Sequence, residues 1–422
     1  MERCNVHVFA SDVLPLPGLP TSGGGLRSWQ LIEGLRAHGL EVTYSMPAEV
    51  YLGKIFEKAI AAEENEKAWN FENQEALLER FDPEVALWCN APTLQVRPDW
   101  PGRARFLADL HGPINMESVF VTKRTLEDTT RELTGALARY DGFSCVSGRQ
   151  RYYWTGLLAA AGILIDEVPF AVTPLSVEVE RDPGERGVPD ELRLIYAGGF
   201  YPWQNCMEVL VAIGEELDRA GTGRLDLFGG VHEFSDSPEF QELFARLRTF
   251  DRVHLHGFVA RDELAAYYRR ASAAVDLMHR NIERELAVTT RTAEYLAQGI
   301  PPLYNNYNIL SDLVRRHEAG WCLDPDDLEG VRRLVRHLLV HHAEEIPRRS
   351  ANAARIYTEE LTVPATTAAL AKVCRQLGTE VRSGGIRRFQ APTALRTAKP
   401  FHKRFYYAWQ ALSGKRVRIE KK

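Results

Sequence analysis

The sequence predicts an α/β protein built from two doubly wound domains, each a parallel sheet covered by helices. Apolar strand-like runs alternate with amphipathic helical runs along most of the chain, as in successive βαβ units. The length of 422 residues exceeds the usual size of one domain and suggests two. The alternation stops once, in the charged, apolar-poor stretch 176–193, and then restarts. We therefore place the domain boundary after residue 178.

The first domain is expected over residues 1–178. Its opening run, NVHVFAS, is too short before Asp12 for a secretory signal and is typical of a buried strand. Further strands are expected in EVTYSMP (41–47), VALWC (85–89), ARFLADL (104–110) and GFSCVS (142–147), with helices over 28–39 and 148–162. These elements make a Rossmann-like sheet.

The second domain is expected over residues 179–378 and repeats the same alternation. Strands are predicted in LRLIYAGG (192–199), RLDLFGG (224–230), RVHLHGF (252–258), AAVDLM (273–278) and IPPLYN (300–305). Helices are predicted over 238–249, 261–272 and 289–299. Two such halves face each other across a cleft lined by the carboxyl ends of both sheets, where such sheets bind ligands.

Composition places the chain among globular cytoplasmic proteins. It is 45% hydrophobic and 26% charged, and it holds no run of eighteen apolar residues that could span a bilayer. Six cysteines are scattered without a C-x-x-C pair or a His-Cys cluster at zinc spacing. We interpret them as reduced core residues and expect no metal site.

A glycine-rich loop is the first candidate for ligand binding. The stretch PLPGLPTSGGGLRSWQ places Gly23, Gly24 and Gly25 before a helix whose first turn contains Arg27. Glycines let backbone N–H groups approach a phosphate, and a helix N-terminus attracts anions. The G-x-G-x-x-G pattern of dinucleotide binding is absent. The simpler alternative is a flexible loop at an ordinary helix start.

Polar side chains also follow two other first-domain strands. Asp109 and His111 end a buried strand, where a histidine can serve as acid, base or hydrogen-bond donor. The alternative is a solvated turn histidine. Ser147 and Arg149 stand at the next strand end, where a plain serine N-cap is the favoured interpretation.

The second domain offers two glycines after its first strand and two aromatic residues beyond them. Gly198 and Gly199 leave space for a sugar or a diphosphate near the backbone. Tyr201 and Trp203 then provide rings on which a ligand could pack. Ordinary packing of these rings at a domain interface is the alternative.

Arg291 and Glu294 start a helix in the stretch VTTRTAEYLAQG, one turn apart on the same face. The first turn leaves backbone N–H groups unpaired, so it attracts anions. Arg291 can therefore pair with phosphate oxygens, and Glu294 can accept bonds from ribose hydroxyls. A surface pair worth only ~0.3 kcal/mol is the alternative. Apolar neighbours in AEYLAQG favour the ligand-facing interpretation.

Together these stretches resemble the GT-B fold retaining glycosyltransferases of glycosyltransferase family 4, over about residues 5–378. The most specific stretches are TSGGGLRSWQLIEGLRAHGLEVT and RTAEYLAQGIPPLYNN. The resemblance implies transfer of a hexosyl group from a nucleotide diphosphate sugar to an acceptor hydroxyl, with retention. It also implies that Glu294 binds the donor ribose and that Gly24 and Gly25 approach the diphosphate.

The sequence departs from that family in two ways. Leu286 stands where the family often has a second glutamate, with Glu283 and Glu285 out of register. The arginine and lysine that many members carry after the first strand of the second domain are missing from GGFYPWQN. Arg291, with Arg27, is therefore expected to neutralise the leaving group.

The predicted site has a catalytic and a donor-binding part. Asp109, His111 and Arg291 form the predicted catalytic set. The predicted donor-binding set is Gly24, Gly25, Arg27, Gly198, Gly199, Trp203, Arg291, Thr292 and Glu294. No metal or other cofactor is expected, because no Asp-x-Asp stands at a strand end and LDPDD is typical of a helix start.

Two alternatives stay open. A nucleotide-sugar 2-epimerase uses the same two-domain fold and would consume its substrate without an acceptor. A non-catalytic scaffold that binds a sugar nucleotide or a protein partner is the other, because the cation pair and one glutamate are missing.

The C-terminal segment 379–422 is basic and aromatic. From Arg382 onward twelve Lys and Arg face the single Glu420, so the rest of a chain with net charge −5 is strongly acidic. Interleaved aromatic rings suit peripheral binding to an anionic inner membrane face, near a lipid-linked or glycan acceptor of polysaccharide synthesis. Packing onto the acidic body is the alternative. Nucleic-acid binding is not expected, because the fold itself is not basic.

Overall fold

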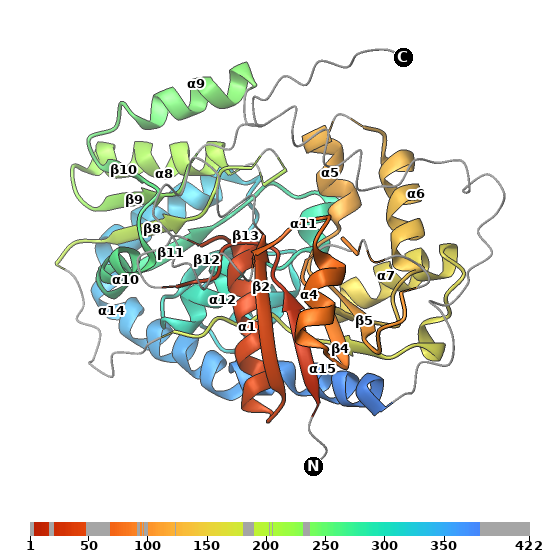
Figure 1. Cartoon of the computed structure of the whole chain (residues 1–422). Helices are drawn as coiled ribbons and strands as arrows, with labels where there is room; N and C mark the ends of the chain where they lie inside the picture. The colour runs from red at the N-terminus through yellow and green to blue at the C-terminus, as the bar shows by residue number, and fades with distance from the viewer. Residues whose placement is uncertain are drawn as a thin grey trace.

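The computed structural model describes residues 4–16, 21–47, 68–90, 93–94, 96, 100–122, 124–179, 190–201, 203–204, 206–230 and 237–379. They form two α/β domains, each with a parallel sheet at its centre (Figure 1). The predicted two-domain doubly wound fold is thereby confirmed. The basic segment expected over 379–422 lies outside the described residues except for Thr379.

The first sheet has seven strands among the described residues, in the order β3-β2-β1-β4-β5-β6-β7, and all of its pairs are parallel. Its strands are β1 (Asn5–Phe9), β2 (Glu41–Pro47), β3 (Ala68–Trp69), β4 (Val85–Trp88), β5 (Arg105–Leu110), β6 (Gly142–Cys145) and β7 (Phe170–Val172). Its helices are α1 (Gly23–Ala37), α4 (Gln74–Phe81), α5 (Ile114–Thr122), α6 (Leu126–Leu137) and α7 (Gly148–Ala160), with the short 3-10 helix η1 (Ile165–Glu167) before β7.

The second sheet has six parallel strands in its described part, in the order β10-β9-β8-β11-β12-β13. They are β8 (Arg193–Ala197), β9 (Arg224–Phe228), β10 (Val253–Gly257), β11 (Ala273–Asp276), β12 (Pro302–Asn305) and β13 (Trp321–Leu323). The helices are α8 (Met207–Ala220), α9 (Pro238–Leu247), α10 (Arg261–Arg270), α11 (Ile282–Leu286), α12 (Thr290–Ala297), α13 (Ile309–Arg316) and α14 (Leu328–Glu360).

The last described helix, α15 (Val363–Thr379), returns to the first domain and lies beside α1 (Figure 1). Leu370, Cys374 and Leu377 are buried in the same core as strand β1. The approach of α1 and α15 is close, because a Cβ on Gly34 would lie 2.3 Å from Thr367 Oγ1. The predicted second domain, residues 179–378, included this helix because the helix follows the second sheet in the chain. In the structure α15 instead buries its apolar face on the first sheet.

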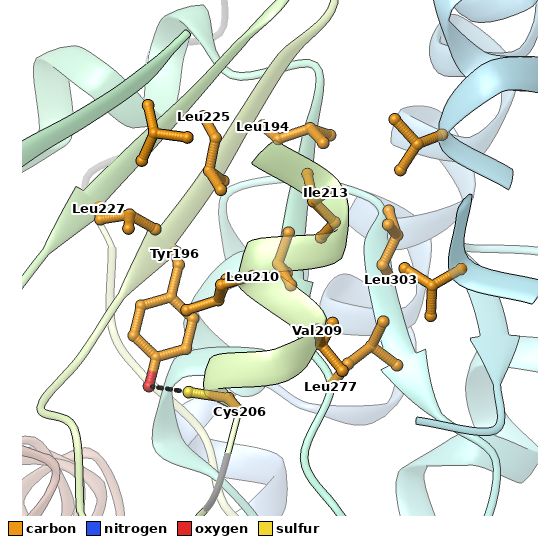
Figure 2. Packing of buried hydrophobic residues seen from close by; sticks show 14 of the residues in the cluster. Leu194, Tyr196, Cys206, Val209, Leu210, Ile213, Leu225, Leu227, Leu277 and Leu303 are labelled. Atoms are coloured by element: carbon orange, nitrogen blue, oxygen red, sulfur yellow. Dashed lines mark hydrogen bonds between the residues drawn. The ribbon is translucent and has the colours of Figure 1, made fainter. Parts of the chain in front are cut away.

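The core of the second domain packs α8 against β8 and β9 (Figure 2). Leu194, Leu210 and Leu225 are fully buried there, and each such side chain stabilises the fold by about 1.5–3 kcal/mol relative to exposure. Tyr196 on β8 belongs to this core, and the Cys206 thiol donates to its hydroxyl at 3.5 Å. Tyr196 is therefore held in a fixed position by the core, near the carboxyl end of β8.

Each sheet changes the direction of its strand order at one place, between β1 and β4 and between β8 and β11. The carboxyl ends of strands at such switch points are where doubly wound sheets bind ligands. The N-termini of α1 and α12 follow these places and meet across the domain interface, since a Cβ on Gly23 would lie 2.9 Å from Thr290 Oγ1. No helix in the described part of the chain is long and apolar enough to cross a membrane.

Candidate active site

Arg291 lies in the first turn of α12, against the carboxyl end of β8. Its Cζ lies 4.5 Å above the centre of the Tyr196 ring, and Nη2 donates to Gln204 Oε1 at 2.7 Å. Nε lies 3.8 Å from Asp276 Oδ1, while the buried Nη1 has no hydrogen-bond partner. Burial lowers the pKa of Arg291, but Tyr196 and Asp276 outweigh it and the pKa ends above its usual value. A permanently charged, nearly buried guanidinium with one unused donor group is therefore held at the interface.

Gly198 and Gly199 make room for side chains of the protein itself. A Cβ on Gly198 would lie 2.6 Å from Arg291 Cζ, so only glycine lets the guanidinium sit at this strand end. A Cβ on Gly199 would lie 2.9 Å from the Tyr201 ring. The sequence pointed to these glycines for a ligand, and the structure shows which side chains occupy the space beside them.

Asp276, at the end of β11, is a buried member of the site that the sequence analysis missed. Its Oδ2 accepts bonds from the hydroxyls of Thr289 and Thr292, and its Oδ1 faces Arg291 Nε. Thr292, predicted as a donor contact, is fully buried and holds Asp276 in place. The sequence signal was the last polar residue of AAVDLM, which ends a strand next to a switch point.

Glu294 lies in the second turn of α12 with 5% of its surface exposed. Its Oε1 pairs with Arg261 Nη1 at 2.6 Å, and its Oε2 accepts a bond from the Tyr268 hydroxyl at 3.0 Å. The carboxylate is therefore oriented by two partners from α10. Carboxylate oxygens have further lone pairs, so this geometry leaves acceptor capacity for a hydroxyl.

The glycine-rich loop forms the N-terminus of α1 and is capped from within the chain. Ser22 Oγ accepts bonds from the backbone N–H groups of Gly24 and Gly25 at 3.1 and 3.4 Å, and it donates to Asp12. Burial raises the pKa of the Asp12 carboxyl. Ser22 thus already accepts bonds from the two N–H groups that the sequence suggested could approach a phosphate.

Arg27 and Asp109 form a bidentate ion pair in the interior. Arg27 Nε and Nη2 donate to Asp109 at 3.0 and 2.8 Å, and Ser144 Oγ donates to the same carboxylate at 2.5 Å. Arg27 Nη1 bonds Gln30 Oε1 at 2.8 Å. Both partners are fully buried. Arg27, predicted to face a diphosphate, therefore has no exposed surface here, and its charge is compensated by Asp109.

His111 follows β5 directly and keeps part of its surface exposed. Burial, followed by the cations Arg27 and Arg284, lowers its pKa to about 4, against the opposing effect of Asp109. The imidazole is therefore neutral at pH 7 and can donate or accept a hydrogen bond. Asp109 stands two residues before His111 and stabilises the strand end from which the histidine projects.

A carboxyl pair that the sequence analysis did not predict joins the two domains. Glu117, in the first turn of α5, lies beside Glu283 of α11, and burial followed by the Glu283 carboxylate raises the pKa of Glu117. Both oxygens of Glu283 also accept bonds from the Arg284 guanidinium. Of the two glutamates left open by the sequence, Glu283 is the one that faces the first domain, whereas Glu285 pairs with Arg280 at 2.7 Å near the surface.

Further contacts fix the two domains to each other. Arg149 Nη1 donates to the Tyr307 carbonyl at 2.6 Å, and Gln150 Nε2 donates to the Leu286 carbonyl at 3.2 Å. Ser147 is the N-cap of α7 and accepts from Gln150 N, as the favoured interpretation expected. Trp203 stacks on Tyr201, with ring centres 4.9 Å apart, and reaches Phe120 of α5 at 6.2 Å. The aromatic residues of the second domain thus pack at the interface.

Comparison with known proteins agrees with this architecture. Residues 191–341 match the family model described as glycosyl transferases group 1. Sucrose-phosphate synthase from Thermosynechococcus elongatus superimposes with a TM-score of 0.64 and 16% identity, over 89% of this chain and 99% of its own. HepE from Anabaena, in complex with UDP-glucose, gives a TM-score of 0.63 and 12% identity, over 90% and 100% of the two chains.

A third solved structure, described as trehalose-6-phosphate from E. coli bound with UDP-2-fluoro glucose, gives a TM-score of 0.59 and 12% identity, over 89% of this chain and 99% of that one. No curated protein matches the chain. At these identities the likeness establishes the fold, so the protein has the GT-B architecture of two doubly wound domains. Within it, the match to the family model of group 1 glycosyl transferases falls in the second domain.

Proposed function

We propose that this protein is a retaining glycosyltransferase that moves a hexosyl group from a nucleotide diphosphate sugar to an acceptor hydroxyl. Arg291 is the observation that carries the proposal. Its guanidinium is held beside the β8–β11 switch point with a buried, unpartnered Nη1, in the first turn of a helix. An unused cationic donor at a helix N-terminus favours binding of an anion. The diphosphate of the donor is the anion that this domain class suggests.

Bond breaking at the anomeric carbon places negative charge on the departing diphosphate. Preorganised donors at that position supply much of the stabilisation in such reactions. Arg291 and the N-terminus of α12 fill this role in our proposal, in place of a metal ion. His111, neutral at pH 7, faces the reacting sugar, and Glu294 binds the ribose with its remaining lone pairs. Arg27 and Asp109 act as a positioning pair behind His111.

UDP-sugars are the donors that we propose to test first. Two of the structural neighbours are named as complexes with UDP-glucose or UDP-2-fluoro glucose. We further propose that the acceptor is a glycan or a lipid-linked glycan of polysaccharide synthesis. The basic segment after Arg382 would then bring a cytoplasmic protein to the inner membrane face.

A non-catalytic sugar-nucleotide-binding protein is the second candidate. Both oxygens of Glu294 are engaged by Arg261 and Tyr268, and Leu286 stands where the resembled family often has a second glutamate. A thermal-shift screen of nucleotide sugars, followed by turnover with and without glycan and lipid-linked acceptors, separates the candidates. Binding with acceptor-dependent turnover supports the transferase, and turnover without an acceptor supports an isomerase. Binding without turnover supports the scaffold.

Substitutions of Arg291 test the proposed role directly. Arg291→Ala is expected to weaken UDP binding by roughly 10–150-fold, because a charge-assisted bond contributes about 1.5–3 kcal/mol. Arg291→Lys keeps the charge without the planar guanidinium, so its UDP affinity should lie between those of the unaltered protein and Arg291→Ala. Arg269→Ala, an exposed arginine in the last turn of α10, is the control. Unchanged UDP affinity in Arg291→Lys and Arg291→Ala, measured by calorimetry, would contradict the assignment.

A further inference from the structure

Glu117 and Glu283 bring two carboxyl groups from different domains to one point. Glu117 packs over the Gly112 turn, since a Cβ on Gly112 would lie 2.7 Å from Glu117 Oε1. Glu283 is almost fully buried, and both of its oxygens are bonded to Arg284. Glu117 keeps part of its surface exposed. Glu117 is thus the member of the pair that a ligand can reach, and Glu283 is held in position behind it.

The charges around the pair favour one shared proton. The Arg284 guanidinium compensates the negative charge of one carboxylate. That carboxylate belongs to Glu283, with which Arg284 forms an ion pair. Burial and the neighbouring Glu283 raise the pKa of Glu117 to about 8, against the opposing effect of Arg284. Among its neighbours, burial lowers the pKa of His111 and raises the pKa values of Tyr153 and Tyr201. The raised pKa of Glu117 favours its protonated form, which can donate a hydrogen bond.

Ring contacts link α5, which carries Glu117, to the strand end beside Arg291. Phe120 of α5 lies 6.2 Å from Trp203, and Trp203 stacks at 4.9 Å on Tyr201, which packs against Gly199. Gly112, over which Glu117 packs, follows His111 directly in the chain. A second ionised carboxylate here would repel a diphosphate, whereas a protonated carboxyl does not. Hydroxyl groups are suitable ligands for such a carboxyl, because they both donate and accept hydrogen bonds.

We propose that Glu117 hydrogen-bonds a hydroxyl of the donor sugar, with Glu283 and Arg284 as positioning residues for its carboxyl group. The inference rests on the proposed function, because it presumes that a nucleotide diphosphate sugar occupies the interface. It adds a sugar contact from the first domain to the diphosphate contact from the second. It assigns Glu117 to recognition of the sugar and not of the nucleotide.

The experiment compares the affinities of UDP and UDP-glucose, by calorimetry, for the full chain and its variants. In the unaltered protein UDP-glucose should bind more tightly than UDP. Glu117→Ala should reduce that preference about five- to tenfold while leaving UDP affinity unchanged, and Glu117→Gln should retain most of it. Glu285→Ala, on α11 beside Glu283 but in a pair near the surface, is the control and should change neither affinity.

The outcomes separate this inference from the proposed function. Binding of UDP-glucose with an unreduced preference in Glu117→Ala, or no preference in the unaltered protein, overturns the role of Glu117 and leaves the function standing. Absence of binding to both UDP and UDP-glucose overturns both. Melting curves establish that each variant is folded, and Glu117→Gln provides a test if Glu117→Ala does not fold.

The pH dependence provides a second readout. Because the pKa of Glu117 is raised from 4.5 to about 8 on folding, its contribution to stability is present below pH 4.5 and is lost as the pH rises through 8. Glu117→Gln removes this titration, so its melting temperature should fall less than that of the unaltered protein between pH 5 and 9. The infrared carbonyl band of a protonated carboxyl should also disappear in this variant at pH 7. An unchanged band and an unchanged pH profile would contradict the shared proton.

Discussion

Asp109 shows how a single residue in this site depends on its partners. Its carboxylate accepts two bonds from Arg27 and one from Ser144 without any contact with solvent. Burial by itself would raise the pKa of Asp109, but Arg27 and the hydrogen bonds outweigh it and hold the pKa below its usual value. Breaking such a pair leaves a buried charge without compensation.

We therefore expect Asp109→Asn to destabilise the first domain by about 3–5 kcal/mol. Asp312→Asn is the matched control, because Asp312 pairs with Arg315 at 2.8 Å but is 75% exposed. That exposed pair should contribute less than about 1 kcal/mol. Chemical denaturation of both variants measures the two changes in unfolding free energy. Equal losses would show that Arg27 and Asp109 are not a buried unit in solution.

At the scale of elements, the end of β8 and the start of α12 fit each other through Gly198. The Arg291 guanidinium occupies the position that any larger side chain at Gly198 would need. Tyr196, on the same strand, supports that guanidinium from below with its ring. The end of β8 therefore contributes both the Tyr196 ring that contacts the guanidinium and, at Gly198, the space that the guanidinium fills.

Gly198→Ala is expected to displace Arg291 and to weaken UDP binding about tenfold or more, at a stability cost of about 1–3 kcal/mol for overpacking. Gly156→Ala is the control, because a Cβ there meets nothing within 4 Å in the middle of α7. That change should stabilise the protein by about 0.5–1 kcal/mol and leave binding unchanged. Calorimetry and denaturation together test this pair, and full UDP affinity in Gly198→Ala would contradict the proposed position of Arg291.

For the whole molecule, α15 closes the fold by packing on α1, and Gly378 lies against Cys4 near its end. The described chain stops one residue later, at Thr379, before the basic segment. We expect a chain that ends at Gly384 to keep the melting temperature of the full chain, because both cores are then complete.

The same truncation tests membrane binding by the basic segment. Each Lys or Arg near an anionic surface contributes about 1 kcal/mol, and the segment contains twelve after residue 381. The full chain should sediment with anionic vesicles, less so at high salt, and the truncated chain should stay in solution. Equal sedimentation combined with a lower melting temperature of the truncated chain would instead show that the segment packs onto the fold.

Much of the architecture was predictable because its signals are local. Strands β1, β2, β4 to β6 and β8 to β12 fall in the runs that the sequence marked, since buried parallel strands are short apolar stretches. Strands β3, β7 and β13 were missed because they contain only two or three residues. Their existence depends on a neighbouring strand and not on a pattern of their own.

The sequence by itself determined two doubly wound domains and the placement of Arg291 at a helix N-terminus, because periodicity and helix starts are written in adjacent residues. Only the tertiary structure decided how the polar groups are paired. Arg27 reaches Asp109, 82 positions away, instead of facing solvent, and Glu117 meets Glu283 from the other domain. Such pairs form where buried charges find compensation, and no local pattern records which distant partner will be near.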